Sequence, residues 1–151
     1  MVVGCGSKGP EVKTLPATAQ HLQVAAPWPD AGQIPRRYTC DGANAVPRIT
    51  VGGVPKGTAQ VALLMTDPDA PGGGFTHWTH WGKTEGRNSF GKVGYGGPCP
   101  PKGDKPHHYV ITAYAVRRKL PLARGAEPAD VVDAIHANAL ASGSVTGTYG
   151  R

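Results

Sequence analysis

The pattern of apolar and polar positions predicts a chain built mainly from strands. Ala59 to Met65 is almost continuously apolar and is bounded by turn-forming residues, which is typical of a fully buried strand. His107 to Val116 alternates between two faces, and one face carries both His107 and Tyr109. Phe75 to Trp81 is aromatic and also favours a strand. Shorter strands are expected over His21 to Ala26, Ile34 to Cys40 and Arg48 to Val51.

One helix is predicted towards the end of the chain. Pro128 suits the first helical position, and Asp130 in the first turn interacts favourably with the helix dipole. Val132, Ile135 and Ala139 recur at helical spacing, and we expect the helix to end near Ser142-Gly143. The expected fold class is therefore mostly β with one C-terminal helix.

Composition qualifies this picture, because 22 Gly and 15 Pro stand among 151 residues, about twice the usual share. A disordered chain would be poor in apolar residues and rich in charge, whereas this one is 39% hydrophobic and 17% charged. Gly and Pro concentrate between Pro68 and Pro106, which predicts long structured loops there. We expect residues 1–20 to form a flexible leader and 21–151 a single domain without a membrane-spanning helix.

The net charge of +6 permits acidic partners but does not require them. The only dense basic run, Arg117-Arg118-Lys119, is interpreted as a solvated loop that follows a strand. No helix-turn-helix, zinc-finger or RNA-binding signature is present, so no nucleic-acid partner is expected. The Gly94 to Pro101 segment lacks the Lys-Ser/Thr of a P-loop, so nucleotide hydrolysis is unsupported. No cofactor is expected.

The three cysteines, Cys5, Cys40 and Cys99, have no Cys-x-x-Cys spacing, which argues against a structural zinc site. Val2-Val3-Gly4-Cys5 resembles the lipobox at which bacterial lipoproteins are lipidated. The residues before Cys5 are too few for a secretory signal, so either the true start lies upstream or the match is chance. The protein is exported or lipid-anchored in the cell envelope in the first case, and cytoplasmic in the second.

Several segments carry residues with chemical potential. Asp67-Pro68-Asp69-Ala70-Pro71 follows the predicted buried strand, and two carboxylates this close need cations, donors or a shared proton, or else form an ordinary turn. Strict alternation places His77 and Thr79 on one face of their strand, with Trp78 and His80 on the other. The glycines of Gly94 to Pro101 can let backbone N–H groups approach a ligand as an anion-binding nest.

Five motifs follow one another along the chain: Ile34 to Gly42, Asp67 to Pro71, His77-Trp78, Gly94 to Pro101 and His107-His108-Tyr109. This combination resembles the phosphatidylethanolamine-binding protein family, in its bacterial Raf-kinase-inhibitor-like branch, over about Leu22 to Arg151. The resemblance implies a β-sandwich of mainly antiparallel strands with a C-terminal helix. It also implies a small pocket that binds anions such as the phosphate of a phospholipid head group. The pocket residues that it implies are Asp67, Asp69, Pro71, His77, Gly97, Pro98, His107, Tyr109 and Tyr149.

Imidazole, phenol and backbone N–H groups would supply the donors that an anion needs. Carboxylates are unusual ligands for a phosphate. We therefore interpret Asp67 and Asp69 as orienting other groups, or as accepting from an amine or a protonated phosphate oxygen. The resemblance further implies that Cys40 and Cys99 approach each other and form a disulfide, which would fit an exported protein.

The chain departs from the family pattern after Trp81, which leads almost directly to Asn88-Ser89-Phe90-Gly91. A piece of strand and its loop are missing, and such a loss would cost several kcal/mol through unfilled volume. The sequence leaves open whether the shortened 81–88 region still closes a pocket.

The leading hypothesis is a non-catalytic binding or regulatory protein for a small anion, either phosphate or a phospholipid head group. The alternatives are an inhibitor that docks on a kinase or protease, and a pocket made defunct by the shortened region. Catalysis is not expected, because no Gly-x-Ser-x-Gly occurs and Cys99 lies between prolines. A metal site built from Asp67, Asp69, His77 and His107 has suitable ligand types, but the resemblance argues against it. Membrane contact is expected only through a lipid anchor at Cys5.

Overall fold

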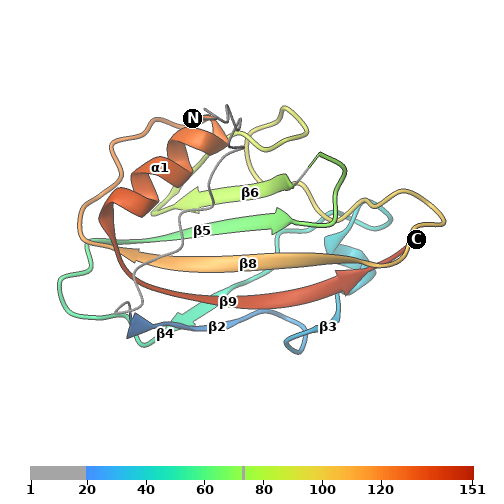
Figure 1. Ribbon diagram of the computed structural model, residues 1–151, viewed down its shortest axis with the longest axis horizontal. Coiled ribbons are helices and arrows are strands. Elements are labelled where there is room, and N and C mark those ends of the chain that lie inside the picture. Colours follow the sequence, from blue (N-terminus) through green and yellow to red (C-terminus); the bar gives the residue numbers. More distant parts are fainter. Residues whose placement is uncertain (1–19, 73) are drawn as a thin grey trace, which may run out of the picture.

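The computed structural model describes residues 20–72 and 74–151, and most of its strands belong to one sheet (Figure 1). The strands of this sheet are β1 Gln20–His21, β3 Gly32–Gln33, β5 Gln60–Asp67, β6 Phe75–Trp81, β7 Thr84–Glu85, β8 His107–Val116 and β9 Ala139–Tyr149. Their order is β1-β9-β8-β5-β6-β7, and β3 also pairs with β9. Neighbouring strands are antiparallel from β9 to β7, whereas β1 and β3 run parallel to β9.

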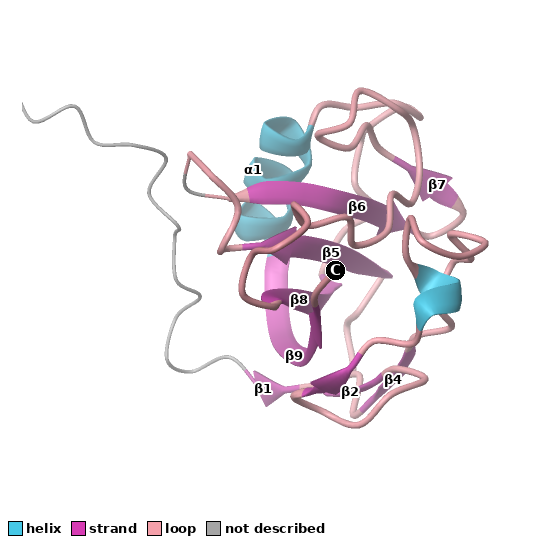
Figure 2. Cartoon of the chain, turned by 90° about the vertical axis from the view of Figure 1, so that its right-hand side faces the viewer, coloured by secondary structure: helices cyan, strands magenta, loops and turns pink. Residues whose placement is uncertain are grey.

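A smaller sheet and a helix cover the two faces of the large sheet. The small sheet pairs β2 Gln23–Ala25 with β4 Thr50–Gly52, and the helix is α1 Pro128–Asn138. Ile111 of β8 lies in a core cluster to which Val51 of β4 packs, whereas Tyr114 of β8 shares a second cluster with Ile135 of α1. The two clusters therefore place the small sheet and α1 on opposite faces (Figure 2), and the fold is a mostly-β sandwich.

The free edge of β9 is covered by the segment that contains β1 and β3. Between these strands, the amides of Leu22 and Ala31 donate to carbonyls of β9, each at 2.8 Å. Glycine permits this approach, since a Cβ on Gly143 would collide with the carbonyl of Leu22, and one on Gly147 with side chains of the same segment. The edge of the sheet is thus closed by backbone that runs parallel to β9 and pairs with it in two places.

The predicted strand over Ile34 to Cys40 is wrong, because this segment forms a short 3-10 helix, Arg36–Tyr38. Pro35 precedes the helix and has no N–H to donate to a ladder. The Oγ1 of Thr39 donates to the carbonyl of Arg36 at 2.8 Å and stabilises the turn. Local hydrogen bonds therefore replace strand pairing here.

The predicted end of the helix near Ser142-Gly143 is also wrong, because α1 ends at Asn138 and β9 begins at the next residue. The side-chain amide of Asn138 donates to the carbonyl of Ala134, and its own carbonyl accepts from the amide of Arg117, both at 2.9 Å. The chain then turns straight into the strand, so the helix is not the last element. Among residues 20–72 and 74–151, no helix is both long and apolar enough to cross a bilayer.

The strands predicted over Phe75 to Trp81 and His107 to Val116 are confirmed with the same bounds, but β6 does not alternate strictly. Its register against β5 shifts at Met65/Thr66, so that His77 is the extra residue of a β-bulge. Trp78 lies opposite Met65, which lies opposite Ile111 of β8, and Tyr109 shares the face of Ile111. The His77 ring contacts Tyr109 and so lies on this face as well, not on the face of Thr79 as alternation predicted.

Candidate functional site

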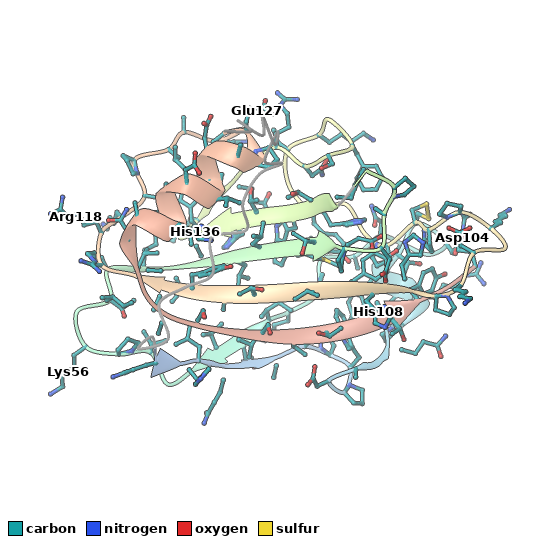
Figure 3. The ribbon with its side chains drawn as sticks, viewed as in Figure 1. Lys56, Asp104, His108, Arg118, Glu127 and His136 are labelled. Carbon is teal, nitrogen blue, oxygen red and sulfur yellow. A yellow bond between two sulfur atoms is a disulfide. The ribbon has the colours of Figure 1, made fainter. Side chains whose placement is uncertain are left out.

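A cavity of about 170 Å³ lies where the C-terminal end of β5 meets the N-terminal ends of β6 and β8. Antiparallel pairing brings these three ends together, and each supplies side chains to the cavity. Loops complete its wall. The lining residues are Asp67, Ala70, Pro71, Phe75, His77, Phe90, Cys99, Pro100, Pro101, His107 and Tyr109. Figure 3 labels Asp104 and His108 at this end of the sheet, opposite the end that carries Lys56 and Arg118.

The buried imidazole of His77 packs among aromatic rings, with centroid distances of 4.8 Å to Phe75, 5.4 Å to Phe90 and 5.2 Å to Tyr109. Its Nδ1 lies 2.6 Å from the carbonyl oxygen of Gly96. Burial lowers the pKa of His77, although the hydrogen bond to Gly96 acts in the opposite direction. The ring is therefore neutral near pH 7, with its hydrogen on Nδ1 and a lone pair on Nε2.

The second histidine of the cavity, His107, stands between two carboxylates. Its Nδ1 donates to Asp67 Oδ2 at 2.8 Å, and its Nε2 donates to Asp104 Oδ2 at 3.2 Å. The hydrogen bond to Asp67 raises the pKa of His107, burial opposes this, and Asp104 raises it further. Both ring nitrogens are thus engaged, and the imidazolium form is favoured.

Tyr109 contributes a hydroxyl that is buried at the cavity. Its side chain is 1% exposed, and its oxygen has no hydrogen-bond partner among residues 20–72 and 74–151. Burial raises the pKa of Tyr109, and the nearby charge of Asp67 adds to the shift, so the hydroxyl keeps its proton. An unpartnered buried hydroxyl costs about 1–3 kcal/mol, which a ligand oxygen that accepts from it would recover.

Asp69 lies outside the cavity and ties the turn after β5 to the start of β8. Its Oδ2 accepts from both the amide and Nδ1 of His108, each at 2.7 Å, and these bonds lower the pKa of Asp69. Its own amide donates to Asp67 Oδ1 at 2.8 Å. Asp67 therefore holds both the turn and His107, while Asp69 is not among the lining residues.

Three glycine amides of the glycine-rich loop donate to protein acceptors, so these glycines do not form the predicted anion nest. Gly94 donates to the carbonyl of Gly86, Gly96 to that of His77, and Gly97 to Oδ1 of Asn44. A Cβ on Gly97 would collide with the backbone of residues 38 and 39. Gly97 and Pro98 lie next to the lining residues in sequence but are not among them.

A disulfide joins Cys40 to Cys99 and attaches this wall to the segment around the 3-10 helix. The amide of Cys40 also donates to the carbonyl of Pro98 at 3.1 Å. Cys99 lines the cavity, so the disulfide forms part of its wall. Cys5, the candidate for lipidation, lies outside the described residues.

Tyr149 lies opposite His107 in the β8–β9 register, but it does not line the cavity. Its hydroxyl donates to Asp41, which also accepts from Arg151 at 3.1 Å, and these bonds lower the pKa of Asp41. Tyr149 instead borders a separate open concavity of about 490 Å³ formed with residues 33–36. The structure thus separates Tyr149 from the predicted site.

The shortened region after Trp81 forms a tight turn and a well-bonded loop. Gly82 adopts φ 59° between β6 and β7, a conformation that favours glycine. Buried Asn88 then accepts from the amides of Phe90 and Lys92 at 3.0 and 3.2 Å, and donates to the carbonyl of Gly94. This loop places Phe90 on the cavity, so the shortened segment still contributes a wall.

Sequence reasoning did not assign a role at the site to Phe75, Phe90 or Asp104. Phe90 belongs to the Asn-Ser-Phe-Gly run, and Asp104 stands three residues before His107, but neither position forms a local pattern that signals a cavity. The ligand types proposed for a metal site do not converge, since no group of three or more His, Cys, Asp or Glu in the described ranges could hold a metal ion.

The family model described as phosphatidylethanolamine-binding protein matches residues 25–150. YbcL of Escherichia coli is 37% identical over 137 residues, which cover 74% of this chain and 75% of that protein. LppC of Mycobacterium tuberculosis, which is named as a lipoprotein, is 34% identical over 178 residues, covering 97% of this chain and 88% of that protein. A UPF0098 protein of Pyrococcus abyssi is 31% identical over an alignment of 173 positions that covers all 151 residues of this chain. Because the alignment is longer than the chain, that relative has residues without a counterpart here.

Solved structures agree with the sequence comparisons. The crystal structure of Escherichia coli YbcL, described as a member of the mammalian PEBP family, has a TM-score of 0.79 and is 33% identical, covering 87% of this chain and 99% of that chain. CT736 of Chlamydia trachomatis has a TM-score of 0.81 at 25% identity, covering 88% of this chain and 99% of that chain. By family model, sequence identity and fold together, the chain belongs to the phosphatidylethanolamine-binding protein family.

Proposed function

We propose that this chain is a non-catalytic binding protein whose cavity takes a small anion, the phosphate of a free ester or of a phospholipid head group. Family membership supports ligand binding in general. The observation that carries the finer proposal is Tyr109, whose side chain lines the cavity with His77 and His107 and whose buried hydroxyl lacks a protein partner. An unpaired buried hydroxyl is costly, and a ligand that accepts from it would offset this cost.

The size of the cavity supports a head-group ligand rather than a whole lipid. At about 30 Å³ per water in liquid, 170 Å³ holds roughly five or six water-sized groups. Most of the wall is apolar, with Phe75, Phe90 and three prolines. Such a wall excludes water and strengthens the few polar contacts inside.

The state of the candidate nucleophile supports a non-catalytic role. The sulfur of Cys99 is held in the disulfide to Cys40, so it is not available as a thiolate. His107 donates from both nitrogens and has no lone pair with which to act as a base.

The test is a calorimetric titration with methyl phosphate of the wild-type protein and of Tyr109→Phe. We expect the variant to bind about tenfold or more weakly, because the ligand loses its buried donor, and to unfold at the same or a higher urea concentration. Tyr114→Phe is the matched control, since Tyr114 lies on the same strand but packs towards α1. Equal affinity of Tyr109→Phe and wild type would contradict the proposal.

We also propose that the protein is attached to a membrane through Cys5, supported by the Val2-Val3-Gly4-Cys5 sequence and by the lipoprotein name of its relative LppC. Mass spectrometry of the protein isolated from its own cells should find an acylated N-terminal cysteine. A cysteine that carries no acyl chain would exclude this attachment.

A further inference from the structure

The hydrogen-bonding capacity of the cavity is unbalanced, because its side chains offer more acceptors than donors. His107 spends both ring hydrogens on Asp67 and Asp104. Cys99 is oxidised, the Asp67 carboxylate can only accept, and the remaining side chains, apart from His77 and Tyr109, are apolar. Among the described side chains that line the cavity, Tyr109 therefore provides the one donor that is not already used.

His77 acts as an acceptor towards a ligand. Its Nδ1 lies 2.6 Å from the Gly96 carbonyl oxygen, a contact that requires the ring hydrogen on Nδ1 and leaves a lone pair on Nε2. Protonation of this ring is opposed by its enclosure between Phe75, Phe90 and Tyr109, although Asp67 favours it and the His107 cation opposes it. These groups of β5, β6, β8 and the loop after β7 are the ones packed around the ring.

The local charge points in the same direction. The buried carboxylate of Asp67 lines the cavity and is neutralised by the His107 cation, while Asp104 adds a negative charge on the other side of that ring. The sum of these three groups is negative, and the guanidinium of Arg151, which lies 3.7 Å from Cys99 Sγ on the wall, is itself paired with Asp41. A doubly charged anion would be repelled by this negative charge. Its oxygens have no hydrogen to donate, so they would also be repelled by the lone pair on Nε2 of His77.

From this arrangement we propose that the cavity takes its ligand as a protonated acid, of which a phosphate monoester monoanion is the model. One ligand oxygen keeps its hydrogen and donates to Nε2 of His77, while another accepts from the hydroxyl of Tyr109. This inference rests on the proposed function and specifies the ligand further. It excludes fully ionised anions such as sulfate, and phosphate diesters, which carry charge but no hydrogen to donate. Of the two ligands of the proposed function it therefore selects the free phosphate monoester over the head group of an intact phospholipid, whose phosphate is a diester.

The test compares three anions on the wild-type protein by calorimetry at pH 5 and pH 8. Methyl phosphate and dimethyl phosphate are both singly charged at pH 5, but only methyl phosphate has an O–H, while sulfate is doubly charged and has none. We expect methyl phosphate to bind at least about tenfold tighter than either at pH 5. Because the second pKa of a phosphate monoester is about 6, its affinity relative to dimethyl phosphate should fall up to about 100-fold by pH 8.

The outcomes separate this inference from the proposed function. Dimethyl phosphate or sulfate binding at pH 5 as tightly as methyl phosphate would overturn the inference and leave an anion site standing. Absence of binding by all three at both pH values would overturn the proposed function, and the inference with it. A preference for methyl phosphate that does not decline as the pH rises through 6 would also overturn the inference.

A variant provides a second test that does not depend on pH. In His77→Phe the acceptor is lost while the aromatic packing against Tyr109 is kept, so methyl and dimethyl phosphate should bind equally at pH 5. A preference as large as that of the wild type would overturn the role of His77. The comparison of anions on the wild-type protein stands if the variant does not fold.

Discussion

The Cys40–Cys99 disulfide gives the largest stability effect that the structure allows us to estimate. The two cysteines are 59 residues apart in sequence, and closing a loop of this length lowers the entropy of the unfolded chain. The chain-entropy relation gives about 4 kcal/mol at 25 °C for such a loop. Replacing both residues, as Cys40→Ser/Cys99→Ser, should therefore lower the free energy of unfolding by about 4 kcal/mol, or the melting temperature by roughly 8–16 °C.

The cavity wall around Cys99 should nevertheless persist without the disulfide, because three hydrogen bonds also join residues 38–44 to residues 95–98. They run from Cys40 N to the Pro98 carbonyl, from Gly97 N to Asn44 Oδ1, and from the Tyr95 hydroxyl to the Tyr38 carbonyl, at 3.1, 2.9 and 2.6 Å. We therefore expect the affinity for methyl phosphate to change far less than the stability.

Urea denaturation of the oxidised protein, the reduced protein and the double variant measures the effect, all in a Cys5→Ser background to prevent thiol exchange. The reduced protein and the double variant should agree with each other and show a larger denaturant slope than the oxidised protein, since their unfolded chains expand further. A difference below about 1 kcal/mol between oxidised and reduced proteins would refute the loop-entropy reasoning.

Two further predictions concern His107. Asp104→Ala frees Nε2 of His107 to donate into a ligand, so methyl phosphate should bind more tightly by calorimetry, and an unchanged or weaker affinity would contradict this reading of Asp104. The hydrogen bond to Asp67 raises the pKa of His107, so the folded protein holds this proton more tightly than the unfolded chain. Its contribution to stability is therefore complete below about pH 6.5 and is lost as the pH rises through the raised pKa. Urea denaturation across this pH range should show a decline in the free energy of unfolding of the wild type and a smaller decline in Asp67→Asn. An equal decline in both proteins would argue against a stabilising Asp67–His107 pair.

The strands with strong patterns could be predicted from sequence, and those whose pairing depends on distant segments could not. β6 and β8 begin and end where aromatic and alternating runs predicted. β9 was missed because Ala139–Tyr149 is rich in Gly, Ser and Thr, and its partners are supplied by β8 and the N-terminal segment. The Ile34 to Cys40 run has strand-like composition, but Pro35 and the Thr39 hydroxyl favour a turn.

For the candidate site, the motifs identified residues that meet at one cavity, but not the geometry of that cavity. Asp67, Pro71, His77, His107 and Tyr109 all line one cavity. The position of His77 depends on a bulge, which a pattern of alternation cannot reveal. The hydrogen bonds of the glycine amides and the placement of Asp104 beside the imidazole arise from tertiary contacts between loops, for which no local signal exists.

The backbone that covers β9 has a consequence for self-association. An uncovered β9 would present a row of free N–H and C=O groups along eleven residues, two of them glycines without side chains to obstruct a second strand. The segment from Gln20 to Ile34 pairs with β9 through β1, β3 and the backbone amides next to them. The strand at the other edge of the sheet is β7, which is only two residues long. Proteolysis between β1 and β3 would therefore convert a closed sheet into one that can recruit further chains and form aggregates.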